Sequence, residues 1–456
     1  MNYLSRIVFK CVCIALLLFS VSCLKEHGIE ISNLNQDSVI NEWIYNTMYN
    51  YYYWNDHLPE HPIYSQSPQS FFKSLLYNEG VDDRFSWISD NAEENYNVLH
   101  GVTKEFGFEY FITYADTAKS NLVGVVLYVK KESPAQKSGI KRGDVFTAIN
   151  GNILTKNNIQ QLLNLDYASF IFISDNQKDT VTLNSEIVYE NPILLSKKID
   201  IDNKTIGYLA YTQFTNDKGD GSNEYTNELL SVFEKFKQDR ITDLILDLRY
   251  NPGGQIDLAV TISSLITPNL DTTKTALSIE YNSKIMKYYD NENTSIRFKY
   301  YPNSYIGDNI HNIVFITSGQ TASASEALIN ILKAYTDVTI VGTTTYGKNV
   351  GSTMFTDTYS QSNWAIQPII LRLFNAKHES NYTHGFEPDI NINELNFKLI
   401  QLGDTSEPLL NTALSVITNS QKNSFSKVTK QSLIYNSINE KTNMPLLIKD
   451  INVPQP

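Results

Sequence analysis

Leu246-Asp-Leu-Arg-Tyr-Asn-Pro-Gly-Gly254 is the stretch that decides the fold of this chain. It ends a nearly continuous apolar run, 242–248, which predicts a buried strand. The Asn-Pro-Gly-Gly turn then ends the strand, and 256–266 has the pattern of a helix. The same alternation of strand and helix recurs from residue 204 onward, which is typical of an α/β domain.

A second strand-to-helix turn, Thr321-Ala-Ser-Ala-Ser-Glu326, follows a predicted strand at 312–317 and opens a predicted helix at 324–335. A serine at the start of a helix is most often an N-cap. Here, however, small alanines flank Ser323 and leave its hydroxyl accessible, and the Ala324 amide lies where the helix dipole favours an anion. Ser323 is therefore a candidate nucleophile as well as a candidate cap.

Lys348 lies in Tyr346-Gly-Lys-Asn349, just past a predicted strand at 338–342, so that the chain returns to the same edge of the sheet. Most loop lysines are solvated and protonated. A lysine that acts as a general base must be neutral, which requires burial to lower its pKa well below about 10.4. We expect Tyr346 and Val350 to supply the apolar surroundings.

The two glycines of the first turn allow two interpretations. Gly253 and Gly254 can relieve strain in a tight turn, or one of them can donate a backbone amide to an oxyanion. Both can hold together. Asp247 and Arg249 flank the turn, and we interpret them as a structural pair.

A β-rich region begins near residue 103. Strands are predicted at 106–110 and 122–129, and Ser133-Pro-Ala-Gln-Lys-Ser-Gly-Ile-Lys-Arg-Gly-Asp144 follows. The region resembles a PDZ domain over about 104–188. In such domains a peptide C-terminus adds as a strand to one sheet edge, and loop amides hold its carboxylate. The resemblance implies that Phe106, Gly107 and Phe108 form that loop; the alternative is a spacer without a ligand.

The N-terminal 23 residues have the pattern of a targeting segment. A basic start precedes an apolar run, 11–21, that is too short to span a membrane. The run ends in Phe19-Ser-Val-Ser-Cys23, which resembles a bacterial lipobox. We therefore expect a lipid anchor on Cys23, facing the periplasm or in the outer membrane of a bacterial cell envelope; the alternative is a plain secretory signal.

The composition excludes several classes of function. The net charge of −12 argues against nucleic acid as a partner, since phosphate binding needs a basic face. The chain has no His/Cys cluster with metal spacing and no phosphate-binding loop. We expect no metal ion and no cofactor.

With Gly385-Phe-Glu-Pro-Asp389 added, the ordered motifs resemble the C-terminal processing (tail-specific) serine peptidases over about 38–420. The resemblance implies a crotonase/Clp-like α/β catalytic domain, Ser323 as nucleophile and Lys348 as general base. It also implies an oxyanion hole made by the Ala324 amide and one amide of the glycine pair.

One position departs from the family pattern. Many members carry a glutamine four residues after the lysine, where it helps to orient the base. Here Ser352 occupies that position. Its hydroxyl can donate or accept a hydrogen bond but reaches less far, so Ser352 is a candidate orienting residue only.

The predicted architecture is α/β and multidomain, with a β-rich PDZ-like domain and a small N-terminal helical domain beside the catalytic domain. The expected segments are a signal peptide (1–23), a tether and helical domain (24–102), the PDZ-like domain (103–190), the catalytic domain (191–403), and a C-terminal helix with a polar tail (404–456). In the helical domain, helices are predicted from residue 38 and over 67–77.

The expected function is a serine endopeptidase that cuts protein or peptide substrates near their C-termini. A first alternative is an idle peptidase fold that only captures peptide C-termini. A second, an acyl-CoA site built on the glycine turns, is disfavoured because a secreted protein meets little coenzyme A.

Overall fold

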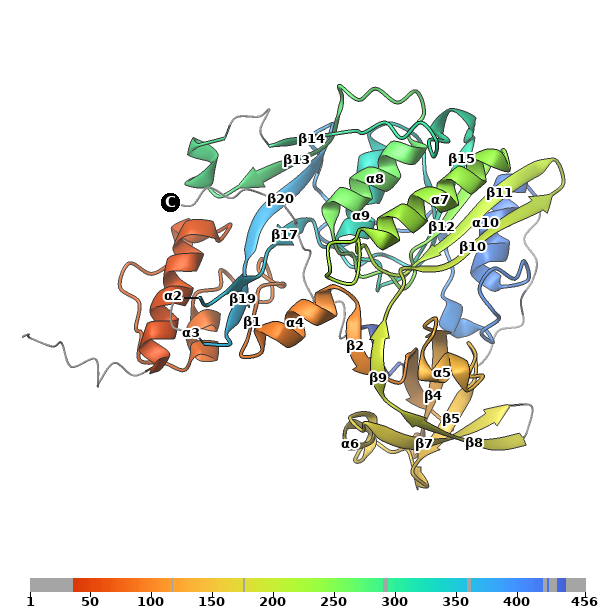
Figure 1. Ribbon diagram of the computed structural model, residues 1–456, viewed down its shortest axis with the longest axis horizontal. Helices are drawn as coiled ribbons and strands as arrows, with labels where there is room; N and C mark the ends of the chain where they lie inside the picture. Colours follow the sequence, from red (N-terminus) through yellow and green to blue (C-terminus); the bar gives the residue numbers. More distant parts are fainter. Residues whose placement is uncertain are drawn as a thin grey trace, which may run out of the picture.

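The computed structural model describes residues 36–439, except 117, 175–176, 290–293, 359–361, 421–424 and 426–432. The expected signal segment and Cys23 lie outside the described residues. Within the described part, no helix combines the length and the apolar character needed to cross a membrane. Figure 1 shows a large α/β body with the N-terminal helices on one side and the PDZ-like region below it.

The α/β body is built on a sheet of six strands in the order β10-β11-β12-β15-β16-β21. β10 is antiparallel to β11, and the remaining pairs are parallel. Their bounds are β10 Ile193–Ile201, β11 Lys204–Tyr211, β12 Asp243–Asp247, β15 Asn312–Thr317, β16 Thr339–Gly342 and β21 Ile390–Asn391. The alternation predicted from residue 204 onward is confirmed.

Helices cover both faces of this sheet (Figure 1). Alternate residues of β12 show why: Leu244 and Leu246 face a core shared with three helices, whereas Ile245 faces the core under α10. The three helices are α7 Glu224–Gln238, α8 Ile256–Ile266 and α9 Ala324–Lys333, and α10 spans Pro408–Thr418.

Two smaller sheets join the body to the N-terminal region. One has the order β14-β13-β20-β17, in which β13 and β14 pair antiparallel; the other has the order β1-β19-β18. Their bounds are β13 Thr275–Tyr281, β14 Ser295–Arg297, β17 Val350–Ser352, β20 Ile369–Asn375, β1 Trp87–Ser89, β18 Phe355–Thr356 and β19 Ala365–Gln367. Because β1 pairs with β19, the N-terminal region shares a sheet with the α/β body.

The N-terminal helices pack on a core of their own. The predicted helices are confirmed as α2 Gln36–Tyr51 and α3 Pro68–Ser74, and α4 spans Ala92–Leu99. Ile44, Met48 and Phe72 are buried between α2 and α3, with Ile366 of β19 in the same cluster. This cluster holds the N-terminal region against the body.

The PDZ-like region is entered and left through a two-stranded ribbon, β2 Val102–Glu105 with β9 Glu186–Tyr189. Its sheet runs in the order β22-β3-β4-β5-β7-β8, with β6 on β5. The elements are β3 Phe108–Tyr114, β4 Leu122–Val129, α5 Pro134–Lys137, β5 Val145–Ile149, β6 Asn152–Ile153, α6 Ile159–Leu163, β7 Tyr167–Ser174, β8 Gln177–Asn184 and β22 Tyr435–Asn436. The edge strand β22 comes from the segment predicted only as a polar tail.

Candidate active site

Ser323 lies between β15 and α9, at the N-cap position of the helix. Its backbone has φ 60° and ψ −113°, a conformation that a residue with a side chain rarely adopts and that costs about 1–3 kcal/mol. Its side chain is buried, with 1% of the residue exposed, and its Oγ has no hydrogen-bond partner. The hydroxyl is therefore unpaired, but it is buried, whereas the sequence predicted an accessible hydroxyl.

The two strand-to-helix turns are bonded to each other. The Ala322 amide and the Ser325 hydroxyl donate to the Asn251 carbonyl (both 3.1 Å), and Thr321 Oγ1 donates to the Leu248 carbonyl (2.8 Å). Since β12 and β15 are parallel neighbours, both turns leave the same edge of the sheet. This edge brings Ser323 against the glycine turn.

At the glycine turn, the two predicted glycines differ in their contacts. A Cβ on Gly253, whose φ is +106°, would lie 2.7 Å from Ser323 Cβ and 3.0 Å from the Ala324 nitrogen. The Gly253 amide donates to Asn251 Oδ1 (2.9 Å). Gly254 packs against the Phe214 backbone. Of the two predicted glycine donors, Gly254 is therefore the better candidate for a hydrogen bond to an oxyanion in this conformation. The Ala324 amide is the second candidate donor, because it lies in the first turn of α9 and lacks an intrahelical acceptor.

Lys348 follows β16 and is buried, with 2% of the residue exposed. Burial lowers its pKa to about 8, while the nearby carboxylates of Asp83 and Glu326 act in the opposite direction. Val350 belongs to an adjacent apolar cluster, and Tyr346 packs against that cluster. The apolar contact to the ammonium group itself comes from Phe85, whose ring centroid lies 5.1 Å from Lys348 Nζ.

Glu326 connects the serine to the lysine. Its fully buried carboxylate accepts hydrogen bonds from the backbone amides of Ser323 (2.9 Å), Gly347 (2.7 Å) and Lys348 (2.8 Å), and from Thr345 Oγ1 (2.6 Å). Burial raises the pKa of Glu326, and these hydrogen bonds oppose the rise. One carboxylate thus fixes the backbone of both candidate catalytic residues.

Asp83–Ser86, from the N-terminal region, completes the surroundings of Lys348. Arg84 donates to the carbonyls of Gly347 and Thr383 (2.9 Å to Thr383). Asp83 is buried, accepts from the amides of Phe85 and Ser86, and accepts from the Tyr52 hydroxyl (2.7 Å). The segment is therefore locked in place beside the lysine.

Ser352 lies at the end of β17, and its Oγ accepts a hydrogen bond from Gln367 Nε2 (3.2 Å). Both residues are fully buried, and Gln367 Oε1 has no partner. The candidate orienting hydroxyl is thus paired with a glutamine of β19. Its role toward Lys348 stays a prediction.

The predicted PDZ loop packs inward. The Phe106 and Phe108 rings contact Phe170 (5.2 and 5.6 Å between centroids), and Gly107 has φ +87° with Ser133 directly against it. Phe106 and Phe108 also line a cavity of about 910 Å³. Their role in holding a carboxylate stays a prediction.

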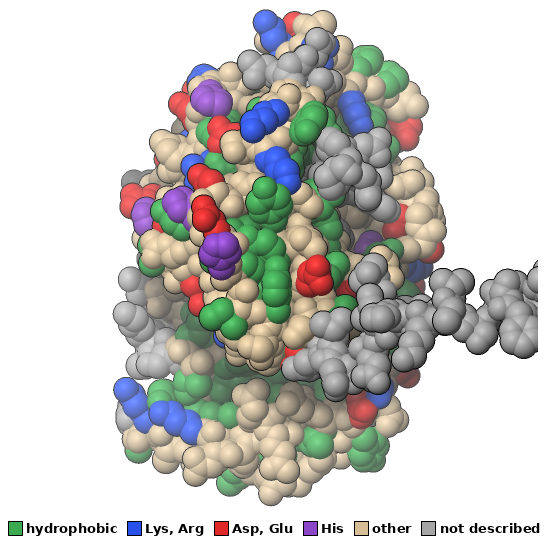
Figure 2. Space-filling view, turned by 90° about the vertical axis from the view of Figure 1, so that its left-hand side faces the viewer, with side chains coloured by type: hydrophobic (Ala, Val, Ile, Leu, Met, Phe, Trp, Pro, Cys, Tyr) green, Lys and Arg blue, Asp and Glu red, His purple; other side chains and the backbone are tan. Residues whose placement is uncertain are grey.

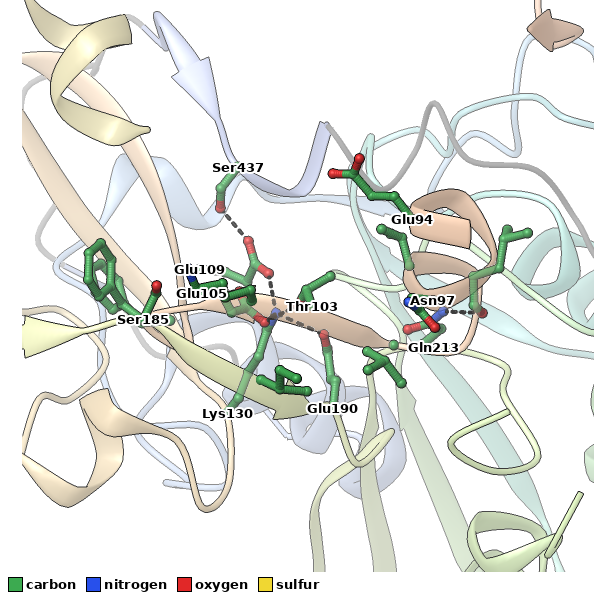
Figure 3. A pocket seen from close by; sticks show the side chains of 18 of the residues that line it. Glu94, Asn97, Thr103, Glu105, Glu109, Lys130, Ser185, Glu190, Gln213 and Ser437 are labelled. Carbon is green, nitrogen blue, oxygen red and sulfur yellow. Dashed lines mark hydrogen bonds and ion pairs between the residues drawn. The ribbon is translucent and has the colours of Figure 1, made fainter. Parts of the chain in front are cut away.

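The cavity extends from this loop to the glycine turn, where Gly253 and Gly254 line it. Figure 2 shows a hollow between the lower part of the molecule and the part above it, with hydrophobic side chains along the hollow. In Figure 3, Lys130 lies in the cavity wall with its ion-pair partners Glu105, Glu109 (3.0 Å) and Glu190 (3.1 Å). The cavity joins the PDZ-like region to the turn beside Ser323.

Three family models match this chain. The model of peptidase family S41 covers residues 205–392, which contain Ser323 and Lys348; the peptidase S41 N-terminal domain covers 39–87 and a PDZ domain covers 125–166. Residues 205–392 thus match the model of peptidase family S41. The resemblance inferred from the motifs is thereby confirmed, and the N-terminal match contains the Asp83–Phe85 segment.

Relatives of this chain include a probable CtpA-like serine protease of Staphylococcus aureus (strain N315), 25% identical over 293 residues. That match covers 61% of this chain and 52% of the relative. A probable CtpA-like serine protease of Staphylococcus saprophyticus is 27% identical over 291 residues, covering 60% and 53%. The chain thus spans about half the length of these relatives.

Among solved structures, that of a protein described as a putative S41 protease from Bacteroides fragilis is similar to this chain, with a TM-score of 0.71 and 25% identity. The match covers 83% of this chain and 97% of that one.

Within the described residues, no group of three His, Cys, Asp or Glu side chains is placed to hold a metal ion.

Sequence reasoning missed two parts of the site. Glu326 had a signal, because it stands three residues after the serine, where a capping-box glutamate reaches back to the N-cap amide. Asp83 and Phe85 had none: only the tertiary fold brings them to Lys348.

Proposed function

We propose that this chain is a serine endopeptidase that cuts protein substrates near their C-termini, with Ser323 as nucleophile and Lys348 as general base. The observation that carries the proposal is the shared Glu326 carboxylate, which holds the backbone of both residues. An unpaired serine hydroxyl and a buried lysine of lowered pKa are what a Ser–Lys pair requires.

The proposed reaction is acyl transfer. Neutral Lys348 takes the proton of Ser323 as Oγ attacks the scissile carbonyl, and the tetrahedral oxyanion accepts hydrogen bonds from the amides of Ala324 and Gly254. Protonated Lys348 then gives the proton to the leaving amine. Water hydrolyses the acyl-enzyme and restores the serine.

In this proposal the PDZ-like region binds the free C-terminus of the substrate. The cavity between the Phe106–Phe108 loop and the glycine turn supports it, because a tail held at the loop can extend through the same space to the glycine turn beside Ser323. We also propose that Cys23 carries a lipid that anchors the protein in a bacterial cell envelope. A Cys23→Ala variant should then move from the membrane fraction to the soluble fraction; retention in the membrane would contradict the anchor.

The deciding test is degradation of an unfolded protein with an apolar C-terminal tail. We expect the wild type to cut it, and Ser323→Ala and Lys348→Ala to lose at least about a thousandfold in rate. The exposed Ser231 and Lys377 provide matched controls, so Ser231→Ala and Lys377→Ala should cut normally. A wild type that binds the tail but never cuts it would favour the idle peptide-capturing alternative.

A further inference from the structure

The edge of β3 is already occupied by a strand. β22 pairs antiparallel with β3, in the register Tyr435↔Ile112 and Asn436↔Phe111. The Ile434 amide donates to the Ile112 carbonyl (2.9 Å), and the Ser437 amide donates to the Tyr110 carbonyl (3.0 Å). The strand comes from the C-terminal part of the same chain.

This edge is the one on which a PDZ-like domain adds a peptide. β3 begins at the end of the Phe106–Phe108 loop, and a bound C-terminus would run antiparallel to the strand with its carboxylate toward the loop. β22 has the same direction, since Tyr435 lies opposite Ile112 and Ser437 lies nearer the loop, beside Tyr110. The backbone groups that a substrate strand would use at Tyr110 and Ile112 are therefore taken.

The side chains after β22 continue toward the catalytic turns. Ile438 is fully buried with Phe111 and Tyr250, and Tyr250 directly precedes the Asn-Pro-Gly-Gly turn. Asn439 Oδ1 accepts a hydrogen bond from Gln320 Nε2 (2.8 Å), three residues before Ser323. Ser437 lines the cavity and bonds Glu109 in its wall, as Figure 3 shows. The segment thus spans the distance from the PDZ edge to the catalytic domain.

We propose that Ile434–Asn439 is a built-in competitor for substrate tails: it occupies the peptide-accepting edge of β3 and must leave before a longer tail can pair there. The proposal rests on the peptide-binding role given above to the PDZ-like region. A tail then binds only the fraction of molecules in which the edge is free, so its apparent dissociation constant increases by the inverse of that fraction.

The test uses two variants that place a carboxylate at an aliphatic position, one within the segment and one directly before it. Ile438→Glu buries a charge and should release the segment, whereas Leu433 is 48% exposed and Leu433→Glu should not. In the Ser323→Ala background, binding of a fluorescein-labelled peptide with the sequence of residues 433–439 is measured by anisotropy. We expect Ile438→Glu to bind it about tenfold more tightly than the parent and Leu433→Glu to match the parent.

A second form of the protein, truncated after residue 420, keeps the test decisive if Ile438→Glu unfolds. The truncated protein should bind the labelled peptide at least as tightly as Ile438→Glu, and should cut the tailed substrate with a KM about tenfold below that of the full chain. Equal binding by all folded forms would overturn the competitor and leave the peptidase intact. No binding by any form would overturn both the competitor and the tail-binding role, while cleavage would still report on Ser323 and Lys348.

Discussion

At the scale of single residues, the burial of Lys348 lowers the stability of the fold. Its pKa falls from the ordinary 10.5 to about 8 because the folded state buries its ammonium group. Below pH 8 the folded protein therefore carries a desolvated charge, which costs about 3 kcal/mol. Between pH 8 and 10.5 the unfolded chain binds more protons at this residue than the folded chain, so stability should rise with pH in that window.

Lys348→Met tests this account. The thioether has similar length and no charge, so we expect the free energy of unfolding to increase by about 2 kcal/mol at pH 7 and to change little above pH 10.5. Urea unfolding at both pH values measures the difference, and Lys377→Met, at an exposed lysine, should have no such effect. Destabilisation of equal size at both pH values would contradict the proposed burial cost.

The residues also show what a local sequence pattern can predict and what it cannot. Ser323, Lys348 and the glycine turn lie in local motifs whose strand-to-helix context could be read directly, and the sheet edge brings the two turns together. Phe85 is separated from Lys348 by most of the chain, so no local pattern could pair them. The engagement of the Gly253 amide by Asn251 likewise depends on a side-chain rotamer that sequence does not determine.

At the scale of elements, the segment Asp83–Ser86 acts on the catalytic body from outside it. The Phe85 ring excludes water from the Lys348 ammonium group, and the Asp83 carboxylate attracts the same charge. Other titratable or charged groups lie near Lys348, contact the apolar cluster around Phe85, or bond to Asp83 or to a neighbouring group: Glu326, Arg84, Tyr52, Tyr53, Tyr346 and Arg372. The measured pH dependence should therefore respond to changes in this segment.

Phe85→Ala should let water reach Lys348 and raise its pKa, so the acidic limb of the kcat/KM profile should move to higher pH by about one unit. Asp83→Asn removes an anion that favours the protonated lysine, so the same limb should move to lower pH. Phe71→Ala is the matched control, because Phe71 is buried in the core of the same N-terminal region away from Lys348. Shifts of the same sign in Phe85→Ala and Asp83→Asn would contradict this mechanism.

At the scale of the whole molecule, a buried ionic network docks the PDZ-like region on the catalytic body. Arg142 of the PDZ-like region pairs with Glu394 (2.8 Å) and donates to the Ile400 carbonyl (2.7 Å). Glu394 also pairs with Arg249 (3.1 Å), which bonds Asp247 (2.8 Å), so the structural pairing predicted for that turn is confirmed. One network therefore links domain docking to the strand that carries the glycine turn.

Arg142→Ala should weaken this docking, because it leaves Glu394 buried with one cationic partner fewer. We expect a loss of about 3 kcal/mol in the free energy of unfolding, with faster proteolytic cleavage near the β2–β9 ribbon. Lys141→Ala, at the exposed neighbouring residue, should change neither. Unchanged stability and unchanged proteolysis in Arg142→Ala would show that the PDZ-like region is held by other contacts.

The global arrangement was only partly predictable. The order of the domains followed from the motifs, and the helix predicted within 404–456 is present as α10. The sequence carries no signal that the chain returns after this helix and adds β22 to the PDZ-like sheet, because a two-residue edge strand has no periodicity. Long-range pairing of this kind depends on the folded surface that receives it.

The burial of Ser323 determines how this protein would behave toward covalent inhibitors. Fluorophosphonate probes label serine hydrolases whose hydroxyl meets solvent, and here 1% of the residue does. In a proteome-wide labelling survey, the protein without substrate should therefore stay unlabelled, as an inactive enzyme would. Labelling that increases sharply when a tailed peptide is added would show that substrate itself uncovers the serine.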